Sequence, residues 1–286
     1  MTGANRSRLA VLTSRVRIEE RLIFTALEGH NIPYDHLDER HVGCELANLC
    51  SDYAVVVVRS MSNTRSLYAA RLFEAAGAIV INSSHVIETC GDKMQTSLAL
   101  LRAGVPTPRT AVTLTPGAAL AMLEQIGYPA VLKPISGSWG RLLAKVNDRE
   151  AAEAVLEHKQ VLGSPAHSVI YIQEYIEKPG RDIRAIVIGD SVISAMYRWS
   201  EHWITNTARG ASATPCTITD ELSDLSLRAA RAVGGGAVAV DILERPDHSF
   251  VVNEVNHTME FHGMIAATGV DVAGAFVQYV RQVAGL

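Results

Sequence analysis

Short apolar segments alternate with segments of helical spacing over roughly residues 1–88. Residues 9–12, 54–58 and 78–81 are apolar runs of strand length, and residues 67–76 predict a helix that ends at Gly77. Strands that alternate with helices form an open parallel sheet with helices on its faces. We therefore expect a small, doubly wound α/β domain over residues 1–88.

The second half of the chain follows a different pattern, because its strands are joined in pairs by close turns. Residues 183–188 and 191–197 predict a hairpin around Gly189, and residues 237–243 and 249–255 predict a second hairpin. This half is expected to be α+β rather than doubly wound.

Charge and short motifs exclude several classes of protein. The 286 residues are 48% hydrophobic and carry a formal net charge of −4, which argues against nucleic-acid binding as the main activity. No G-x-G-x-x-G follows the first apolar run, and no G-x-x-x-x-G-K-[ST] occurs, so neither a dinucleotide fingerprint nor a P-loop is present.

Four cysteines, at 44, 50, 90 and 216, show neither a C-x-x-C pair nor a zinc-type spacing. This pattern is typical of free thiols in a reducing cytoplasm. No apolar stretch approaches the length of a membrane span, so we expect a cytoplasmic protein without a membrane partner.

Two lysines occupy unusual positions. Lys93 begins a predicted helix, where the helix dipole disfavours a cation, and Lys133 ends an apolar strand, where it must pair with an anion or reach solvent. Between Lys133 and Lys145 lies ISGSWGR, a glycine-rich turn whose backbone N–H groups are suited to phosphate oxygens. Solvated surface lysines and an ordinary hairpin tip remain the alternative interpretations.

The segment QEYIEKPGRDIR combines a strand end with two alternating charges. Glu174, Tyr175 and Ile176 offer backbone edges and an apolar wall that suit a flat adenine ring. Asp182 and Arg184 fall on one face of the next strand, where a surface ion pair of little consequence is the alternative.

Arg198, Asn206 and Arg209 lie within a dozen residues, interleaved with Trp199 and Trp203. Such a group can stack on nucleic acid, or it can clamp a transferring phosphoryl group and a carboxylate. The near-neutral charge of the chain disfavours the first interpretation.

Three oxygen donors are expected to converge in the second hairpin. The turn brings Asp241 opposite Glu254, and Asn256 shares the face of Glu254 because the two residues are two apart on one strand. Carboxylate and amide oxygens suit Mg²⁺ rather than zinc, and Mg²⁺ usually keeps phosphates among its ligands. A strand end that turns toward solvent is the alternative.

In this order, Lys93, Lys133, GSWG, QEYIEKPGRDIR, Asp241 and Glu254-x-Asn256 resemble the motifs of the ATP-grasp carboxylate–amine ligases, over nearly the whole chain. GSWGRLLAKV, YIQEYIEKPGRDIR, HWITNTARG and VNEVNHTMEF resemble the RimK-related branch of LysX and ArgX ligases, which join an amino acid to an amino-group carrier protein. The resemblance implies a pre-ATP-grasp domain over 1–88 and an ATP-grasp domain over 89–286, with a small lobe at about 110–172 and a carboxy-terminal lobe at about 173–286.

The resemblance also implies a role for each candidate residue. ATP would contact Lys93, Lys133, Ser136, Gly137, Ser138, Trp139, Gly140, Glu174, Tyr175, Ile176 and Asp182, the last beside the ribose. One or two Mg²⁺ would bind Asp241, Glu254 and Asn256, and Arg184, Arg198 and Arg209 would neutralise the charge of the acyl phosphate and the oxyanion. The incoming amino acid would contact His202, Trp203, Asn206, Thr207, His257, Thr258 and Glu260.

The implied reaction joins the α-amine of an acidic amino acid, with 2-aminoadipate first and glutamate next, to the carboxy-terminal glutamate of a small acidic LysW-type carrier. The alternative is a RimK-like ligase that acts on another protein tail or on a small-molecule carboxylate. Members of the branch often have two glycines after the arginine, whereas Gly210-Ala211 follows Arg209 here, so the choice of amino acid stays open. We also expect a homo-oligomer.

Overall fold

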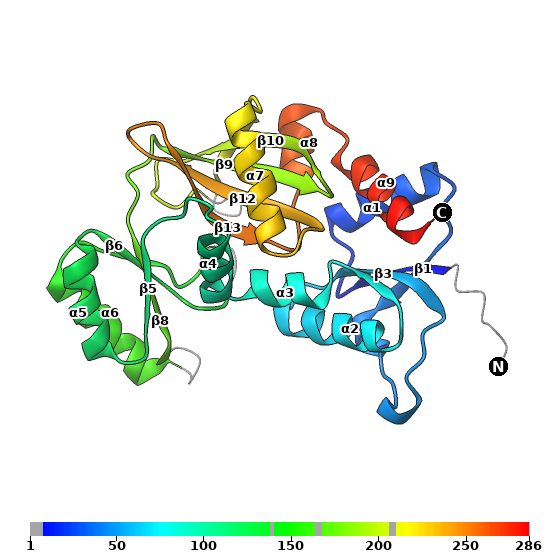
Figure 1. Ribbon diagram of the computed structural model, residues 1–286, viewed down its shortest axis with the longest axis horizontal. Coiled ribbons are helices and arrows are strands. Elements are labelled where there is room, and N and C mark those ends of the chain that lie inside the picture. Colours follow the sequence, from blue (N-terminus) through cyan, green and yellow to red (C-terminus); the bar gives the residue numbers. More distant parts are fainter. Residues whose placement is uncertain (1–7, 138–139, 164–167, 206–209, 286) are drawn as a thin grey trace.

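The computed structural model describes residues 8–137, 140–163, 168–205 and 210–285. It has three sheets, one in each of three regions that follow one another along the longest axis (Figure 1). Ser138, Trp139, Asn206, Thr207 and Arg209, which the sequence assigned to the site, lie outside the described residues.

The amino-terminal region is a parallel sheet with helices on both faces, as predicted. Its strands lie in the order β2-β1-β3-β4, and every pair is parallel. The strands are β1 (Arg8–Thr13), β2 (Tyr34–Asp38), β3 (Tyr53–Arg59) and β4 (Ile79–Ile81), and the helices are α1 (Ile18–Gly29), α2 (Asn63–Ala75) and α3 (Ser84–Gly91), with short 3₁₀ turns η1 (Glu39–His41) and η2 (Leu46–Asn48). The central strands β1 and β3 are buried along most of their length, which explains why their apolar runs are continuous.

The small lobe is an antiparallel sheet in the order β5-β8-β6-β7, with two helices against one face (Figure 1). Its elements are β5 (Thr110–Thr113), α5 (Pro116–Ile126), β6 (Ala130–Lys133), β7 (Ala144–Val146), α6 (Arg149–Leu162) and β8 (Ile170–Glu174). The side chains of Leu123, Leu132, Leu156 and Ile172 form its separate hydrophobic core.

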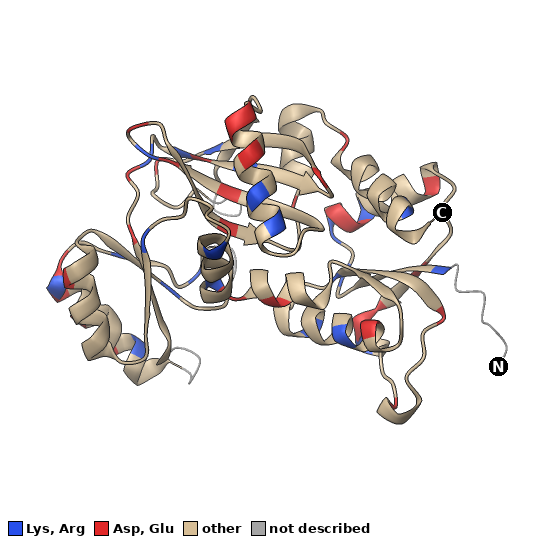
Figure 2. Ribbon diagram, in the orientation of Figure 1, with Lys and Arg blue, Asp and Glu red and all other residues tan. Residues whose placement is uncertain are grey.

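The carboxy-terminal lobe holds a five-stranded antiparallel sheet in the order β11-β10-β9-β12-β13. The strands are β9 (Arg181–Ile188), β10 (Ser191–Trp199), β11 (Ser212–Pro215), β12 (Ala237–Glu244) and β13 (Phe250–Asn256). Helices α4 (Lys93–Arg102) and α7 (Asp220–Ala232) pack against one face, and α8 (His262–Thr268) and α9 (Val272–Ala284) follow the last strand. Helix α7 carries acidic side chains at its first turn and arginines toward its last, which complements its dipole (Figure 2).

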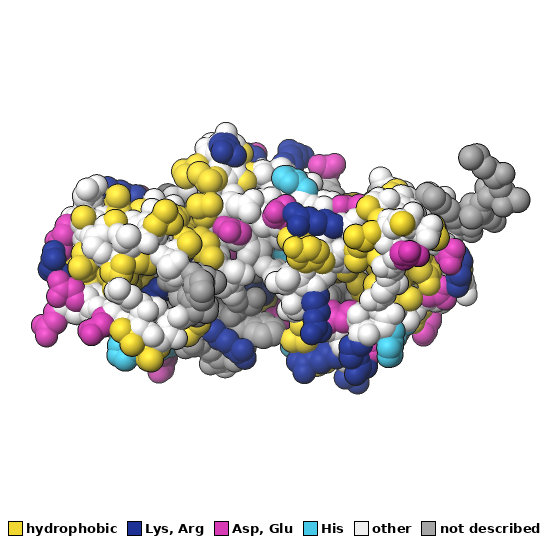
Figure 3. Space-filling model, turned by 90° about the horizontal axis from the view of Figure 1, so that it is seen from below, with side chains coloured by type: hydrophobic (Ala, Val, Ile, Leu, Met, Phe, Trp, Pro, Cys, Tyr) yellow, Lys and Arg dark blue, Asp and Glu magenta, His cyan; other side chains and the backbone are white. Residues whose placement is uncertain are grey.

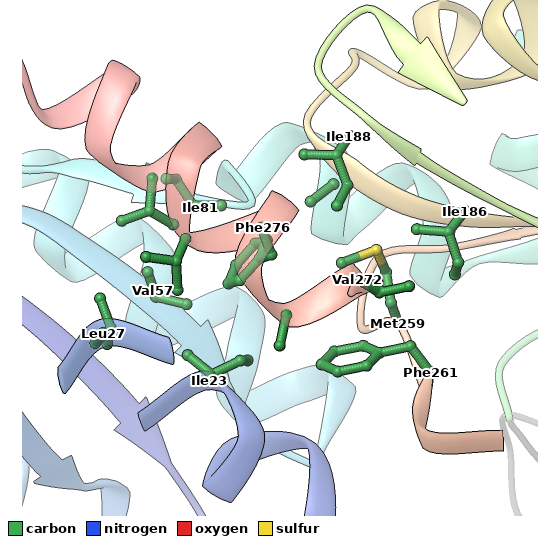
Figure 4. Packing of buried hydrophobic residues seen from close by; sticks show 14 of the residues in the cluster. Ile23, Leu27, Val57, Ile81, Ile186, Ile188, Met259, Phe261, Val272 and Phe276 are labelled. Atoms are coloured by element: carbon green, nitrogen blue, oxygen red, sulfur yellow. The ribbon is translucent and has the colours of Figure 1, made fainter. Parts of the chain in front are cut away.

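One hydrophobic core joins the two ends of the chain. Ile23 and Leu27 of α1 and Val57 of β3 lie in the same cluster as Phe261 and Phe276, the latter from α9 (Figure 4). The amino-terminal sheet and the carboxy-terminal lobe are therefore packed together through α9, so that the side chains between them are held in fixed positions.

Charged and hydrophobic side chains are interspersed on the surface seen from below (Figure 3). In the part of the chain that the structure describes, no helix has the length and apolar character needed to cross a membrane.

Candidate active site

A single cavity is lined by residues from all three regions. The amino-terminal region contributes Arg17, Ser60, Met61 and Asn63, and the small lobe contributes Val131, Lys133 and Gln173. The carboxy-terminal lobe and its connections contribute, among others, Ile176, Lys178, Asp182, Arg184, Arg198, Trp203, Asp241, Leu243, Glu254, Asn256, His257, Thr258 and Glu260. Most of the predicted site residues that the structure describes therefore meet at one place.

Lys133 is buried at the end of β6, and its Nζ donates a hydrogen bond to Asn253 Oδ1 at 2.9 Å. Burial lowers the pKa of Lys133 to about 8, although the nearby Glu254 carboxylate favours the cation. Because its described partner is a neutral amide, Lys133 keeps a charge that suits an anion entering the cavity.

Lys93 begins α4 as predicted, and Asp92 caps the helix by accepting from the backbone N–H of Gln95 at 3.0 Å. The Lys93 Nζ reaches across to the glycine turn and donates to the Gly137 carbonyl at 2.9 Å. Gly137 and Gly140 line the cavity, whereas Ser136 is exposed beside them. The helix start and the glycine turn are thus joined at the cavity wall.

Glu174, Tyr175 and Ile176 line the cavity, and their contact with adenine stays a prediction. The Glu174 side chain is engaged in structural hydrogen bonds. Its Oε1 accepts from the Arg109 backbone N–H at 2.8 Å and from Arg245 Nη2 at 2.6 Å. Ile176 is buried in a small apolar cluster with Leu243 and Val251. Leu243 of β12 lines the cavity together with Ile176, so the apolar wall includes a residue outside the segment predicted for it.

Two arginines and two aspartates form a buried ladder across β10, β9 and β12. Arg198 donates two hydrogen bonds of 2.7 Å to Asp182, and Arg184 donates two, of 2.7 and 2.8 Å, to Asp241. Arg198 Nη2 also lies 3.2 Å from Asp241 Oδ2. Although burial raises the pKa of Asp241, the two guanidinium groups lower it to about 2. Asp241 is therefore ionised at physiological pH.

This ladder changes the interpretation of Asp182 and Arg184, which do not pair with each other. Asp182 is held by Arg198, by the hydroxyl of Thr205 and by Lys178 Nζ at 3.8 Å. The surface ion pair that was the alternative interpretation is wrong, because both side chains are buried and pair with neighbouring strands. The contact between Asp182 and a ribose stays a prediction.

Asp241 and Glu254 are register partners on β12 and β13, as the hairpin predicted. Among the described residues no hydrogen bond to the Glu254 carboxylate is found, and the buried Nδ2 of Asn256 has no partner there. The two side chains are thus not committed to other contacts within those residues, whereas Asp241 is shared with Arg184 and Arg198. Their oxygens are donors of the kind that Mg²⁺ prefers, so the residues fit this ion. No group of three or more His, Cys, Asp and Glu placed for a metal occurs in the described ranges.

Comparison with known sequences identifies the architecture. The sequence model of the RimK-like ATP-grasp domain matches residues 90–280, and that of the LysX preATP-grasp domain matches residues 9–89. The chain belongs to the RimK-like ATP-grasp family. The predicted fold is confirmed, and so is the predicted class of activity, an ATP-dependent carboxylate–amine ligase.

Relatives of this ATP-grasp chain extend over most of its length. It is 36% identical over 277 residues to the glutamate–LysW ligase ArgX of Sulfurisphaera tokodaii, covering 96% of this chain and 98% of the relative. It is 37% identical over 229 residues to the α-aminoadipate–LysW ligase LysX of Sulfolobus acidocaldarius, covering 80% and 83%. A RimK-domain ATP-grasp structure from Sphaerobacter thermophilus superposes with a TM-score of 0.80 at 27% identity, covering 95% of this chain and 98% of that one.

The ATP-grasp site also contains residues that the sequence did not single out. Lys178 donates to Thr205 Oγ1 at 2.6 Å beside the arginine–aspartate ladder. Lys145 Nζ lies 3.9 Å from the centroid of the Tyr175 ring, and Trp203 meets the same ring edge-on at 6.4 Å. Lys178 lies inside QEYIEKPGRDIR, the segment that the sequence assigned to nucleotide binding. The segment was therefore recognised, but the role of this lysine was not.

The sequence also did not point to the arginines of the amino-terminal region that lie beside the cavity. Arg17 forms ion pairs with Glu20 at 2.9 Å and with Glu260 at 3.1 Å. The buried Arg59 forms an ion pair with Glu20 at 3.0 Å and donates a hydrogen bond to the Met259 carbonyl at 2.9 Å. These contacts hold the segment after β13 against the amino-terminal sheet. No local sequence signal marks the contacts to Met259 and Glu260, because these partners lie 200 and 243 residues away.

The predicted amino-acid pocket is only partly assembled on the cavity. Trp203, His257, Thr258 and Glu260 line it, whereas His202 stacks beside Trp203 and accepts from the Ile204 backbone N–H at 3.0 Å. Burial lowers the pKa of His257 to about 4, with Arg59 adding to the effect, so this imidazole is neutral.

Proposed function

We propose that this ligase joins the α-amine of an acidic amino acid, glutamate or 2-aminoadipate, to the carboxy-terminal glutamate of a small acidic LysW-type carrier. The names of the relatives support this assignment. The match to a glutamate–LysW ligase covers 96% of the chain and the match to an α-aminoadipate–LysW ligase covers 80%. The sequence favoured 2-aminoadipate, and the coverage makes glutamate an equal candidate.

The main support for the proposal is that one cavity has an apolar wall, a buried cation and a polar end. Ile176 and Leu243 form an apolar wall, Lys133 supplies a buried cation, and Thr258 and Glu260 make a polar end against the amino-terminal sheet. A nucleotide base, its phosphates and a small polar substrate would find matching environments in that order.

The chemistry requires two displacements. A carboxylate oxygen of the carrier attacks the γ-phosphorus of ATP, forming an acyl phosphate and releasing ADP. The amine nitrogen then attacks the acyl carbon, the phosphate leaves, and the nitrogen loses a proton as the amide forms. No covalent enzyme intermediate is needed, so positioning and charge stabilisation carry the catalysis.

The residues of the chain hold charge at fixed positions for these steps. Lys93 and Lys133 would bind the phosphates, and Asp241, Glu254 and Asn256 would hold Mg²⁺, which when bound offsets phosphate charge. Arg184 and Arg198 are fixed by Asp241 and Asp182, so their guanidinium groups need no reorganisation when negative charge develops nearby. Arg209, Asn206 and Thr207 keep the roles that the resemblance implies.

The proposal also includes the setting of the reaction. The carrier would bind as an acidic protein, the ligase would act as a homo-oligomer in the cytoplasm, and neither nucleic acid nor membrane would be a partner. The near-neutral net charge of −4 supports the exclusion of nucleic acid.

The test is the dependence of ADP release on the carrier. Purified enzyme is mixed with ATP and Mg²⁺, with an acidic carrier that ends in glutamate, and with glutamate or 2-aminoadipate. Sustained turnover of ATP to ADP should require all of them, and the intact mass of the carrier should rise by one amino-acid residue. ADP release at the same rate without any carrier would refute the carrier assignment.

A further inference from the structure

An open groove lies beside the active-site cavity, at the carboxyl edge of the amino-terminal sheet. Its lining consists of Ser14 and Arg15 after β1, Glu39 after β2, Met61 and Ser62 after β3, and Arg65 at the start of α2. Met61 also lines the cavity, so the groove and the cavity adjoin at this side chain. The residues assigned to ATP, Mg²⁺ and the incoming amino acid include none of the charged side chains of the groove.

The groove lies where open α/β sheets characteristically bind ligands. Strands β1 and β3 are neighbours, and the chain runs from β1 toward β2 on one side but from β3 toward β4 on the other. Loops that diverge in this way leave a crevice at the carboxyl ends of the two strands. The Ser14 hydroxyl oxygen accepts from the Met61 backbone N–H at 3.1 Å, which fixes one loop against the other. The groove is therefore a feature of the sheet topology.

The exposed charge in the groove is positive. Glu39 is the one acidic residue among the lining residues, and its side chain is 6% exposed. Its Oε1 accepts from Arg65 Nη1 at 2.7 Å, and its Oε2 accepts from the Ser60 hydroxyl. Arg65 lies above this carboxylate with 67% of its side chain exposed. Glu39 thus holds Arg65 in place from below, and the guanidinium group faces the solvent.

Arg15 supplies a second positive charge, at the junction of the groove with the cavity. Its Nε donates to Met61 Sδ at 3.0 Å, and a thioether sulfur is a weak acceptor. Among the described residues no carboxylate pairs with Arg15. The nearby Arg17 differs, because it forms ion pairs with Glu20 and Glu260. Arg15 therefore offers a charge that the described part of the chain does not compensate.

Apolar side chains adjoin these arginines. Val16 and Ile18, which follow β1 in the same segment as Arg15, are 38% and 50% exposed. A small anion such as phosphate would gain nothing from this apolar surface, whereas a protein partner buries apolar and charged groups together. The combination favours a peptide chain with carboxylate side chains as the occupant of the groove.

We propose that the groove receives the carboxy-terminal tail of the carrier, with acidic residues of the tail over Arg65 and Arg15 and the chain entering the cavity past Met61. The inference rests on the proposed function and adds the surface that receives the partner. An extended tail brings its terminal carboxylate into the cavity, while the carboxylates before it stay beside the arginines. Arg15 and Arg65 act on binding of the tail and take no part in the chemistry.

The first experiment measures the binding of synthetic tails without turnover. Two peptides labelled at the amino terminus are compared, one with four glutamates before a terminal glutamate and one with glutamine at those four positions. Fluorescence anisotropy with the enzyme loaded with ADP and Mg²⁺ should show about 10-fold tighter binding of the acidic peptide. Arg15→Glu and Arg65→Glu should each lower this preference at least about 3-fold, with ADP affinity unchanged. A wild-type enzyme without the preference would overturn the proposal.

Arg71→Glu is the matched control for these charge reversals. Arg71 lies on α2 like Arg65, is paired with Glu88 at 3.0 Å and is 44% exposed, but it does not line the groove. This variant should keep the preference of the wild-type enzyme. An equal loss in Arg71→Glu would show that the overall charge attracts the peptide rather than the groove. Displacement of the peptide by millimolar inorganic phosphate as effectively as by unlabelled peptide would assign the groove to a small anion.

The second experiment follows the path of the tail. A benzophenone side chain is placed in the acidic peptide directly before the terminal glutamate, and the irradiated complex is digested and analysed by mass spectrometry. Because benzophenones react readily with methionine side chains, Met61 should carry the label, and Met61→Leu should lose it. Labelling of other residues with Met61 unmarked would show that the tail enters elsewhere.

These measurements distinguish failure of this inference from failure of the proposed function. If the intact carrier gains no amino acid with the wild-type enzyme, the carrier assignment is wrong, and the peptide comparison still decides whether the groove binds an acidic chain. If the carrier is ligated but Arg15→Glu and Arg65→Glu leave KM for the carrier unchanged, the proposed function stands and the groove is not the docking surface.

Discussion

Arg184 and Asp241 face each other in register on β9 and β12 and are joined by two hydrogen bonds of 2.7 and 2.8 Å. Both side chains are buried, and Arg198 approaches the same carboxylate from β10. A buried pair of this kind contributes little net stability compared with apolar residues of the same shape, but removing one partner leaves a charge without compensation. The pair is therefore better explained by the site than by the fold.

Replacing Asp241 with asparagine should destabilise the protein by about 3–5 kcal/mol, because two buried guanidinium groups lose a shared anion. Urea denaturation followed by circular dichroism measures the change in the free energy of unfolding. The exposed pair of Asp190 and Arg231 is the matched control, and Asp190→Asn should cost less than about 1 kcal/mol. Equal effects at the two positions would contradict the importance assigned to burial.

Binding of nucleotide should draw a proton onto Lys133. Its pKa of about 8 lies below the ordinary value of 10.5, so between these values the free folded protein binds fewer protons than the unfolded chain, and its stability rises with pH there. A phosphate beside Nζ favours the cation, so ADP affinity should fall as pH rises above about 8. Calorimetry in buffers of different ionisation enthalpy should show proton uptake on ADP binding near pH 8.5, and Lys133→Met should abolish it.

Glu254→Ala should abolish turnover while the melting temperature changes little, because the carboxylate has no hydrogen-bond partner among the described residues. Mn²⁺ binding measured by electron paramagnetic resonance in the presence of ADP should weaken at least about 10-fold, since one hard-oxygen ligand is lost. Full activity in this variant would show that the metal assignment is wrong.

The affinity for the carrier should fall steeply as salt concentration rises, because an acidic protein is attracted partly by long-range electrostatics. The dissociation constant is measured at 50 and 500 mM NaCl by biolayer interferometry, with ADP affinity measured in parallel. Carrier affinity that does not respond to salt would argue against an acidic docking partner.

Much of this architecture can be predicted from local sequence patterns. The buried strands of the first sheet, the two hairpins and the opposition of Asp241 and Glu254 follow from apolar runs and turn residues. Strands β2 and β11 were missed because they lie at sheet edges and none of their residues is fully buried. The short helix α3 was missed; Asp92 follows its last residue and caps α4, the helix predicted to begin at Lys93.

The parts of the site that the sequence did not reveal depend on long-range contacts. Asn63 and His257 are 194 residues apart, and neither stands in a pattern that predicts the other. The arginine–aspartate ladder was missed for a similar reason, since alternation along one strand shows which face a residue occupies but not which neighbouring strand supplies its partner.

The core shared by α1, β3 and α9 has a consequence for how the protein is made. Leu27 and Val57 leave the ribosome early, yet they are covered by Phe276 and Val280, which are translated almost last. During synthesis one apolar face of the amino-terminal sheet therefore stays uncovered until α9 has been translated. We expect chaperones to bind this exposed face. Ribosome-bound chains that lack α9 should be cleaved readily by protease in the amino-terminal region, and completion of the last helix should protect it.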